Sequence, residues 1–106
     1  MKFQQFSFGQ IRIDDIDYGY DVVKKASRKV PRSLRTHAAL SLEEKIPWRC
    51  RRLVVGTGEG ALPVMDEVKR EAERHKVELL ILPTEEAMEI LNRYAKSANA
   101  FLHVTC

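Results

Sequence analysis

The apolar residues in the first part of the chain alternate with polar ones. Residues 6–8 and 11–13 each read apolar, polar, apolar, and Gly9-Gln10 lies between them. Alternation with a period of two is typical of antiparallel strands with one face in water, and the glycine suits a type II′ hairpin turn. The same period predicts a third strand over residues 16–22. Its apolar face would be formed by Ile16, Tyr18, Tyr20 and Val22. Residues 1–23 are therefore expected to form a β-meander.

The segment 24–50 has no clear period and is interrupted by prolines. Ser41 is followed three residues later by Glu44, which is the spacing of a capping box and predicts a helical turn from about Leu42. Pro47 would end that turn early, because the residue before a proline avoids helical angles. We therefore expect this segment to be a loop with at most one turn of helix.

Stronger signals fill residues 51–106. Leu53-Val54-Val55 and residues 77–82 are short apolar runs of the kind found in buried parallel strands. Between them apolar residues recur at helical spacing, at Ala61, Met65, Val68 and Ala72. A second helix is expected from Thr84, which can serve as its N-cap, and residues 99–105 predict a final strand. The chain is thus predicted to be a single compact α/β domain, in which a βαβαβ unit follows the meander to form a mixed sheet with flanking helices.

Length and composition support one ordinary globular domain. The chain has 106 residues, of which 44% are hydrophobic and 31% charged, so it can build one core. Its apolar runs are too short to span a membrane, and its first residues lack the apolar stretch of a secretory signal. The two cysteines have no metal-ligand spacing and are expected to be reduced thiols. These features predict a cytoplasmic protein with no membrane partner.

Positive charge is concentrated in residues 22–53, which hold ten basic residues and two acidic ones. This density could follow a nucleic-acid backbone or another anionic surface. Trp48 is the only aromatic residue within the segment, so a platform for base stacking is not apparent, and a solvated loop is the ordinary alternative. The candidate anionic-partner surface consists of Lys24, Lys25, Arg28, Lys29, Arg32, Arg35, Arg49, Arg51 and Arg52.

The glycine-rich loop, residues 56–60, follows one predicted strand and opens the next helix, which is the context of a phosphate-binding turn. Its candidate anion-binding residues are Gly56, Thr57, Gly58 and Gly60. Glu59 would place a carboxylate where a phosphate must sit, and no acidic residue ends the strand over 77–82 to bind a ribose. A tight turn that requires glycine conformations is therefore the main alternative to anion or nucleotide binding.

Other residues with chemical potential lack a partner at a useful spacing. His103 and Cys106 suggest a nucleophile and its base, but side chains three apart on a strand point to opposite faces, and no third group is evident to orient the histidine. His37 and His75 have no metal partner at ligand spacing. The aspartates at positions 14, 15, 17 and 21 fit turns and a wet strand face. The sequence predicts no catalytic residue, metal or cofactor.

Three motifs in the second half of the chain carry a family resemblance. They are Gly56-Thr57-Gly58-Glu59-Gly60, then Leu82-Pro83-Thr84-Glu85-Glu86-Ala87 leading to Leu91-Asn92, then Leu102-His103-Val104-Thr105-Cys106. In order and spacing they resemble the Mth-type domain family, which includes an adipogenesis-associated protein and a mitochondrial complex I assembly factor. The resemblance implies a compact α/β fold with a mixed sheet, a role in binding or assembly, and no established enzyme activity.

The leading functional hypothesis is a non-enzymatic binding or assembly module. It would use the surface around Gly56–Gly60 and the neighbouring basic segment to hold a protein partner or a small anion. A nucleotide binder or small enzyme centred on the glycine-rich loop is the first alternative. Nucleic-acid binding by residues 24–52 is the second.

Overall fold

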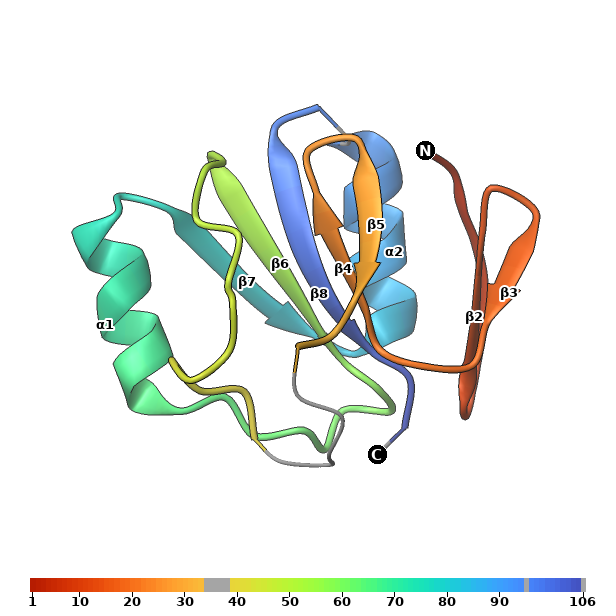
Figure 1. Cartoon of the computed structure of the whole chain (residues 1–106), viewed down its shortest axis with the longest axis horizontal. Helices are drawn as coiled ribbons and strands as arrows, with labels where there is room; N and C mark the ends of the chain where they lie inside the picture. Colours follow the sequence, from red (N-terminus) through yellow and green to blue (C-terminus); the bar gives the residue numbers. More distant parts are fainter. Residues whose placement is uncertain (34–38, 95, 106) are drawn as a thin grey trace.

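The computed structural model describes residues 1–33, 39–94 and 96–105, and these form two sheets and two helices. The smaller sheet is an antiparallel meander (Figure 1). Its strands are β1 (Phe3–Ser7), β2 (Gln10–Ile13) and β3 (Ile16–Tyr18). The alternating pattern of the first residues therefore predicts the meander correctly, because one face of each strand is needed to cover the core.

The larger sheet has five strands in the order β5-β4-β8-β6-β7. They are β4 (Val22–Lys25), β5 (Arg28–Pro31), β6 (Arg52–Thr57), β7 (Glu78–Leu82) and β8 (Ala98–His103). Strand β6 pairs in parallel with β7 and β8, whereas β4 pairs antiparallel with β8 and β5. The predicted α/β class with a mixed sheet is thus confirmed.

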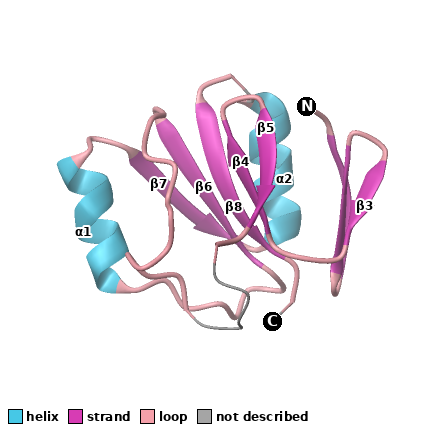
Figure 2. Ribbon diagram, in the orientation of Figure 1, coloured by secondary structure: helices cyan, strands magenta, loops and turns pink. Residues whose placement is uncertain are grey.

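The helices α1 (Asp66–Arg74) and α2 (Thr84–Arg93) cover opposite faces of the larger sheet (Figure 2). Helix α2 packs between β6 and β1, so one apolar core joins the two sheets through it. The second core lies under α1 and the segment that leads from β5 to β6. All six residues of β8 are buried, because this strand has a neighbour on each side and a core on each face. Within the described parts of the chain, neither helix is long and apolar enough to cross a membrane.

The prediction of a third strand over residues 16–22 is wrong. The chain bends at Gly19-Tyr20, so β3 ends at Tyr18 and β4 begins at Val22 in the other sheet. Ile16 and Tyr20 are consequently 55% and 48% exposed and do not share a buried face with Val22. The alternation continues through the bend, and the change of sheet leaves no mark on the pattern.

The expectation of a loop over residues 24–50 is also wrong in its first part. Strands β4 and β5 form a hairpin there, closed by Ala26-Ser27, with Ala26 at φ 56°. From Leu42 the chain makes a turn and no helix, and the amide of Glu44 donates to the carbonyl of Ser41. The hairpin loop has neither Gly nor Asn, which are the residues that usually mark a two-residue turn.

Three local expectations are corrected in detail. Helix α1 begins at Asp66, so Ala61 lies outside it and Met65 is an exposed flanking residue. The first hairpin turns on Phe8-Gly9, because Ser7 pairs with Gln10, and Gly9 takes the second central position with φ 86°. Thr84 does not cap α2 with its side chain, since its hydroxyl bonds to other elements.

Candidate functional site

The glycine-rich loop fastens three elements together at one end of the larger sheet. The amide of Gly58 donates to Thr84 Oγ1 at 2.9 Å, and that hydroxyl donates to the carbonyl of His103 at 2.7 Å. The amide of Thr84 donates to the carbonyl of Gly58, also at 2.9 Å. Strand β6, helix α2 and strand β8 are therefore joined through one threonine side chain. The glycine pattern located the loop, but nothing in it indicated this second role for Thr84.

A hollow of about 290 Å³ lies beside the loop, but its charge is negative. Glu59 and Glu85 line it, together with residues that include Phe8 and Pro83. The amide of Gly60 donates to the carbonyl of Thr57, so it too is used within the chain. Anion binding by Gly56, Thr57, Gly58 and Gly60 stays a prediction, and these surroundings weigh against it.

The predicted basic surface separates into buried, paired and open side chains. Lys24 is 2% exposed, and its ammonium donates to the carbonyl of Ala98; burial lowers its pKa. Arg32 is 4% exposed and is bound to carboxylates. Lys29 pairs with Asp14, and Arg52 pairs with Glu78 and lies over the ring of Tyr94. Arg51 is exposed, and Arg35 lies outside the described residues.

The three remaining residues of the predicted surface gather with Lys45, which is not part of that prediction, around a cleft of about 470 Å³ between the β4–β5 hairpin and residues 45–49. Four exposed basic side chains line it: Lys25, Arg28, Lys45 and Arg49. Its other lining residues are mostly apolar, namely Val23, Ala26, Val30, Pro31, Ile46, Pro47 and Trp48, with Ser33 and Asn99. No carboxylate is among the lining residues, and within the described ranges none of the four cations has an ion-pair partner. We call this feature the basic cleft.

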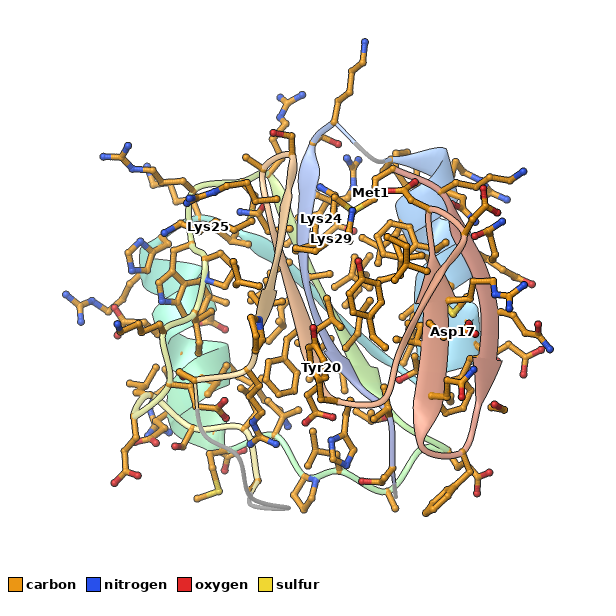
Figure 3. The ribbon with its side chains drawn as sticks, turned by 45° about the vertical axis from the view of Figure 1, so that its right-hand side comes forward. Met1, Asp17, Tyr20, Lys24, Lys25 and Lys29 are labelled. Atoms are coloured by element: carbon orange, nitrogen blue, oxygen red, sulfur yellow. The ribbon has the colours of Figure 1, made fainter. Side chains whose placement is uncertain are left out.

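The alternation of strand β4 decides which lysine reaches the basic cleft. Successive side chains of a strand point to opposite faces, so Lys24 and Lys25 leave the sheet in opposite directions. Figure 3 shows Lys25 on the side away from the smaller sheet, whereas Lys24 and Lys29 lie on the side that faces it. Lys25 shares its face with Val23, which lines the cleft and belongs to the core under α1.

Asn99 holds the two walls of the basic cleft in place. Its side-chain oxygen accepts from the amide of Ala26 at 2.8 Å, and its amide nitrogen donates to the carbonyls of Pro47 and Arg49 at 3.0 and 3.2 Å. Asn99 is 4% exposed, and a buried amide with all these bonds made has a fixed orientation. No sequence pattern indicates this role for Asn99, because its partners are 50 or more residues away along the chain.

A buried ionic network holds the beginning of the segment that leads from β5 to β6. Arg32 binds Glu44 with two parallel hydrogen bonds of 2.7 Å, and it binds Asp21 at 3.0 Å. Its guanidinium also lies 4.9 Å from the ring centre of Phe101. Asp21 further accepts from His103 Nδ1 at 2.7 Å and from the amide of Val104 at 2.9 Å. The network thus joins the start of β4, the end of β5, the turn at Glu44 and the end of β8.

The expectation that Asp21 lies on a solvent-exposed strand face is therefore wrong. Its side chain is 11% exposed, and it is the third group that orients His103. Because an ionised carboxylate only accepts, Nδ1 of His103 donates to it, and Nε2 faces the hydroxyl of Thr105 at 3.2 Å. Cys106 and His37 lie outside the described residues, so the pairing of His103 with Cys106 is not tested. Elsewhere His75 stacks on Trp48 and pairs with Glu71.

The network predicts a specific dependence of stability on pH. Burial alone would raise the pKa of Asp21, but hydrogen bonds from His103, Val104 and Arg32 lower it below the ordinary 3.8. A carboxyl whose folded pKa is depressed stabilises the fold above its unfolded pKa, and this stabilisation is lost as the pH falls through the folded pKa. Below about pH 4, the urea midpoint of the wild type should therefore fall more steeply than that of Asp21→Asn. An exposed carboxyl with a lowered pKa, removed in Asp17→Asn, should change this slope much less.

This chain is similar in structure to several solved proteins. A conserved hypothetical protein, PH1505 from Pyrococcus horikoshii OT3, is 29% identical over 100% of both chains, with a TM-score of 0.80. MT938 is 22% identical over 99% of this chain and 98% of its own, with a TM-score of 0.72. A protein from Bordetella pertussis that is described as a Mth938-like domain is 14% identical over 97% of this chain and 85% of its own, with a TM-score of 0.69.

No family model and no curated protein matches the sequence. The structural likeness extends over the full length of the chain and includes both sheets. The fold of this chain is therefore that of the Mth938-like domain.

Proposed function

We propose that this chain is a cytoplasmic, non-enzymatic binding module of the Mth-type domain family, and that its basic cleft holds an acidic, partly apolar segment of a protein partner. The observation that carries the proposal is the combination of an apolar lining, no carboxylate and four cations without an ion-pair partner among the described residues. An apolar cleft with a few polar groups that fix orientation is the usual form of a ligand site.

The charge pattern around the basic cleft favours an anionic occupant. Elsewhere on the described chain, some exposed cations, such as Arg12, Lys69 and Arg74, pair with neighbouring carboxylates, whereas others, such as Arg51 and Arg93, have no ion pair among the described residues. The four cations of the cleft have no ion pair within the described ranges, so an incoming carboxylate displaces no internal ion pair there. Complementary potentials of this kind speed association and select against basic partners.

The apolar lining favours an occupant with apolar groups over a simple ion or a nucleic-acid backbone. Ile46 and Trp48 are half-buried and lie between the hairpin and helix α1. An apolar side chain of the partner that packs against them would lose contact with water, which makes the free energy of binding more favourable. A phosphate backbone would use the cations and leave this lining empty. The hollow beside the glycine-rich loop is less suited to an anion, since Glu59 and Glu85 line it.

The proposal can be tested with 8-anilino-1-naphthalenesulfonate, which combines an anionic head with an aromatic body. We expect the folded protein to bind this dye with a rise in fluorescence. The double variant Arg28→Ala/Arg49→Ala should weaken binding by about tenfold or more, since each charge-assisted contact contributes about 1 kcal/mol. Addition of an acidic peptide that contains leucine and tryptophan should displace the dye. The measured quantity is the dissociation constant of the dye for each variant.

Arg51→Ala/Arg93→Ala provides the matched control, because it removes two exposed basic residues that do not line the basic cleft. This control should bind the dye like the wild type. Equal loss in both double variants would mean that net charge alone attracts the dye, and it would count against the cleft. Displacement of the dye by inorganic phosphate but not by the peptide would mean that the cleft binds a small anion and not a protein partner. Displacement by single-stranded DNA with a steep dependence on salt would favour nucleic acid.

A further inference from the structure

The two edges of the larger sheet differ in their protection. Strand β5 carries Arg28, Lys29 and Pro31, which are the residue types that natural edge strands use to discourage pairing. Strand β7, at the other edge, reads Glu-Leu-Leu-Ile-Leu, with four apolar residues in five and no bulge in its pairing with β6. Ile81 is 38% exposed, and the leucines of β7 are partly exposed. Apart from Glu78 at its first position, this edge carries no charge and no proline, which makes it a surface for pairing with another strand.

The backbone of β7 leaves hydrogen-bonding groups directed away from the sheet. The amide of Glu78 donates to the carbonyl of Arg51 in the segment that enters β6. In a parallel pair, the backbone N–H and C=O groups of alternate residues point toward the neighbouring strand. Those of Leu80 and Leu82 therefore also point toward β6, whereas the backbone groups of Leu79 and Ile81 point away from the sheet. No other strand of the described chain pairs with β7. Each outward residue therefore offers one amide and one carbonyl.

We propose that β7 pairs with β7 of a second copy of this chain, antiparallel about Leu80. In this register Leu79 of one copy lies opposite Ile81 of the other, so all four outward groups of each strand form hydrogen bonds. A shift by two residues in one direction would bring Pro83, which has no amide hydrogen, opposite Leu79. A shift in the other direction would move Val77, which lies outside the strand, into a pair. The register about Leu80 is thus the one that uses the whole strand.

The charges at the two ends of β7 are complementary in the same arrangement. Lys76 precedes the strand, whereas Glu85 and Glu86 follow it. Arg74 and His75 also precede it but pair with Glu71, and Glu78 at the first strand position pairs with Arg52. Lys76 and both glutamates are exposed. Antiparallel pairing brings the basic end of one copy beside the acidic end of the other, twice in each dimer, as two-fold symmetry requires. A parallel pairing would set like charges together at both ends.

This interface is separate from the basic cleft, which lies at the β5 edge of the sheet. The pairing would join the two five-stranded sheets into one, with a cleft at each outer end. The inference does not depend on what the cleft binds, and its test uses no ligand.

The first experiment is sedimentation equilibrium of the full chain over a range of concentrations. We expect a monomer–dimer equilibrium, and Ile81→Lys should raise the dissociation constant by at least about a hundredfold, because it puts an unpaired charge on each strand of the interface. Ile16→Lys makes the same change at an exposed position of β3 and should leave the dimer intact. A wild type that stays monomeric at all concentrations would overturn the proposal. A dimer equally sensitive to both variants, or to neither, would also overturn it.

A charge exchange tests the orientation of the two strands. Lys76→Glu and Glu85→Lys should each weaken the dimer by about fivefold, since each disturbs two exposed contacts in the symmetric pair. The double variant Lys76→Glu/Glu85→Lys should recover most of the wild-type affinity. Additive weakening in the double variant would contradict antiparallel pairing. Circular dichroism of each variant establishes that the monomer remains folded, so a loss of the dimer is not a loss of the fold.

Discussion

Replacing Arg32 with methionine is expected to lower the free energy of unfolding by about 3–5 kcal/mol, measured by urea titration at neutral pH. Arg32 and Glu44 are each 3% exposed in their side chains, and Asp21 is 11% exposed. Without the guanidinium, the two carboxylates keep the cost of leaving water but lose the cation that compensates it. Removing one partner of a buried pair therefore costs far more than the pair contributes in total.

Two further variants separate charge from geometry. Arg32→Lys keeps the positive charge but cannot form the two parallel bonds to Glu44, so we expect its stability to lie between those of the wild type and the methionine variant. Arg32→Met/Asp21→Asn/Glu44→Gln removes all three charges and should recover part of the loss. If Arg32→Met costs less than about 1 kcal/mol, the network is solvated in solution and the burial argument is wrong.

Gly58→Ala is the second substitution with a large expected effect, a loss of about 3 kcal/mol or more. Gly58 has φ +73°, which is unfavourable for a residue with a Cβ. A Cβ at this position would also lie 1.7 Å from the carbonyl oxygen of Thr105, a backbone atom that no change of rotamer can move away. The loop or the residues that follow β8 would have to shift, which would disturb the bonds made by Thr84. Thermal and urea unfolding of the variant measure this cost.

Gly9→Ala is the matched control for this effect. Gly9 has a similar φ of +86°, but a Cβ there meets no atom within 4 Å. Its expected cost is about 1–2 kcal/mol, which comes from the backbone conformation alone. The difference between the two variants measures the close approach of Gly58 to Thr105. Equal losses would show that only the left-handed conformation matters at Gly58.

Sequence patterns predicted those parts of the fold whose signals are local. The strands β6 and β7 and the helix α2 have apolar runs or helical spacing within a few residues, and each lies close to its expected position. The β4–β5 hairpin was missed because its signal is not local. Lys24 alternates with Val23 like a polar residue on a wet face, yet it is buried because β8 and the smaller sheet surround it. Burial of a charged residue depends on neighbours that the pattern does not contain.

The candidate site was predictable only in composition. The segment 22–53 was correctly identified as basic, but Arg28 and Arg32 are the same residue type, four positions apart, in opposite environments. Arg32 meets Asp21 and Glu44, which lie 11 and 12 residues away on either side, whereas Arg28 faces the basic cleft. Asn99, which fixes both cleft walls, is one asparagine in an apolar strand, and its role depends on contacts across half of the chain. Such roles follow from topology and not from spacing.

The central place of β8 sets an order for folding during synthesis. Strands β4 and β6 each use β8 as a neighbour, yet residues 98–103 leave the ribosome after every other strand of the described chain. Until they emerge, β4 and β6 have open apolar edges, and the bonds from Asn99 and His103 to the rest of the chain cannot form. The larger sheet therefore closes in a late step that brings together segments distant in sequence, which predicts slow folding and a period of exposure to aggregation. A nascent chain stalled before Ala98 should be open to proteases and bound by chaperones, whereas the released chain should be resistant.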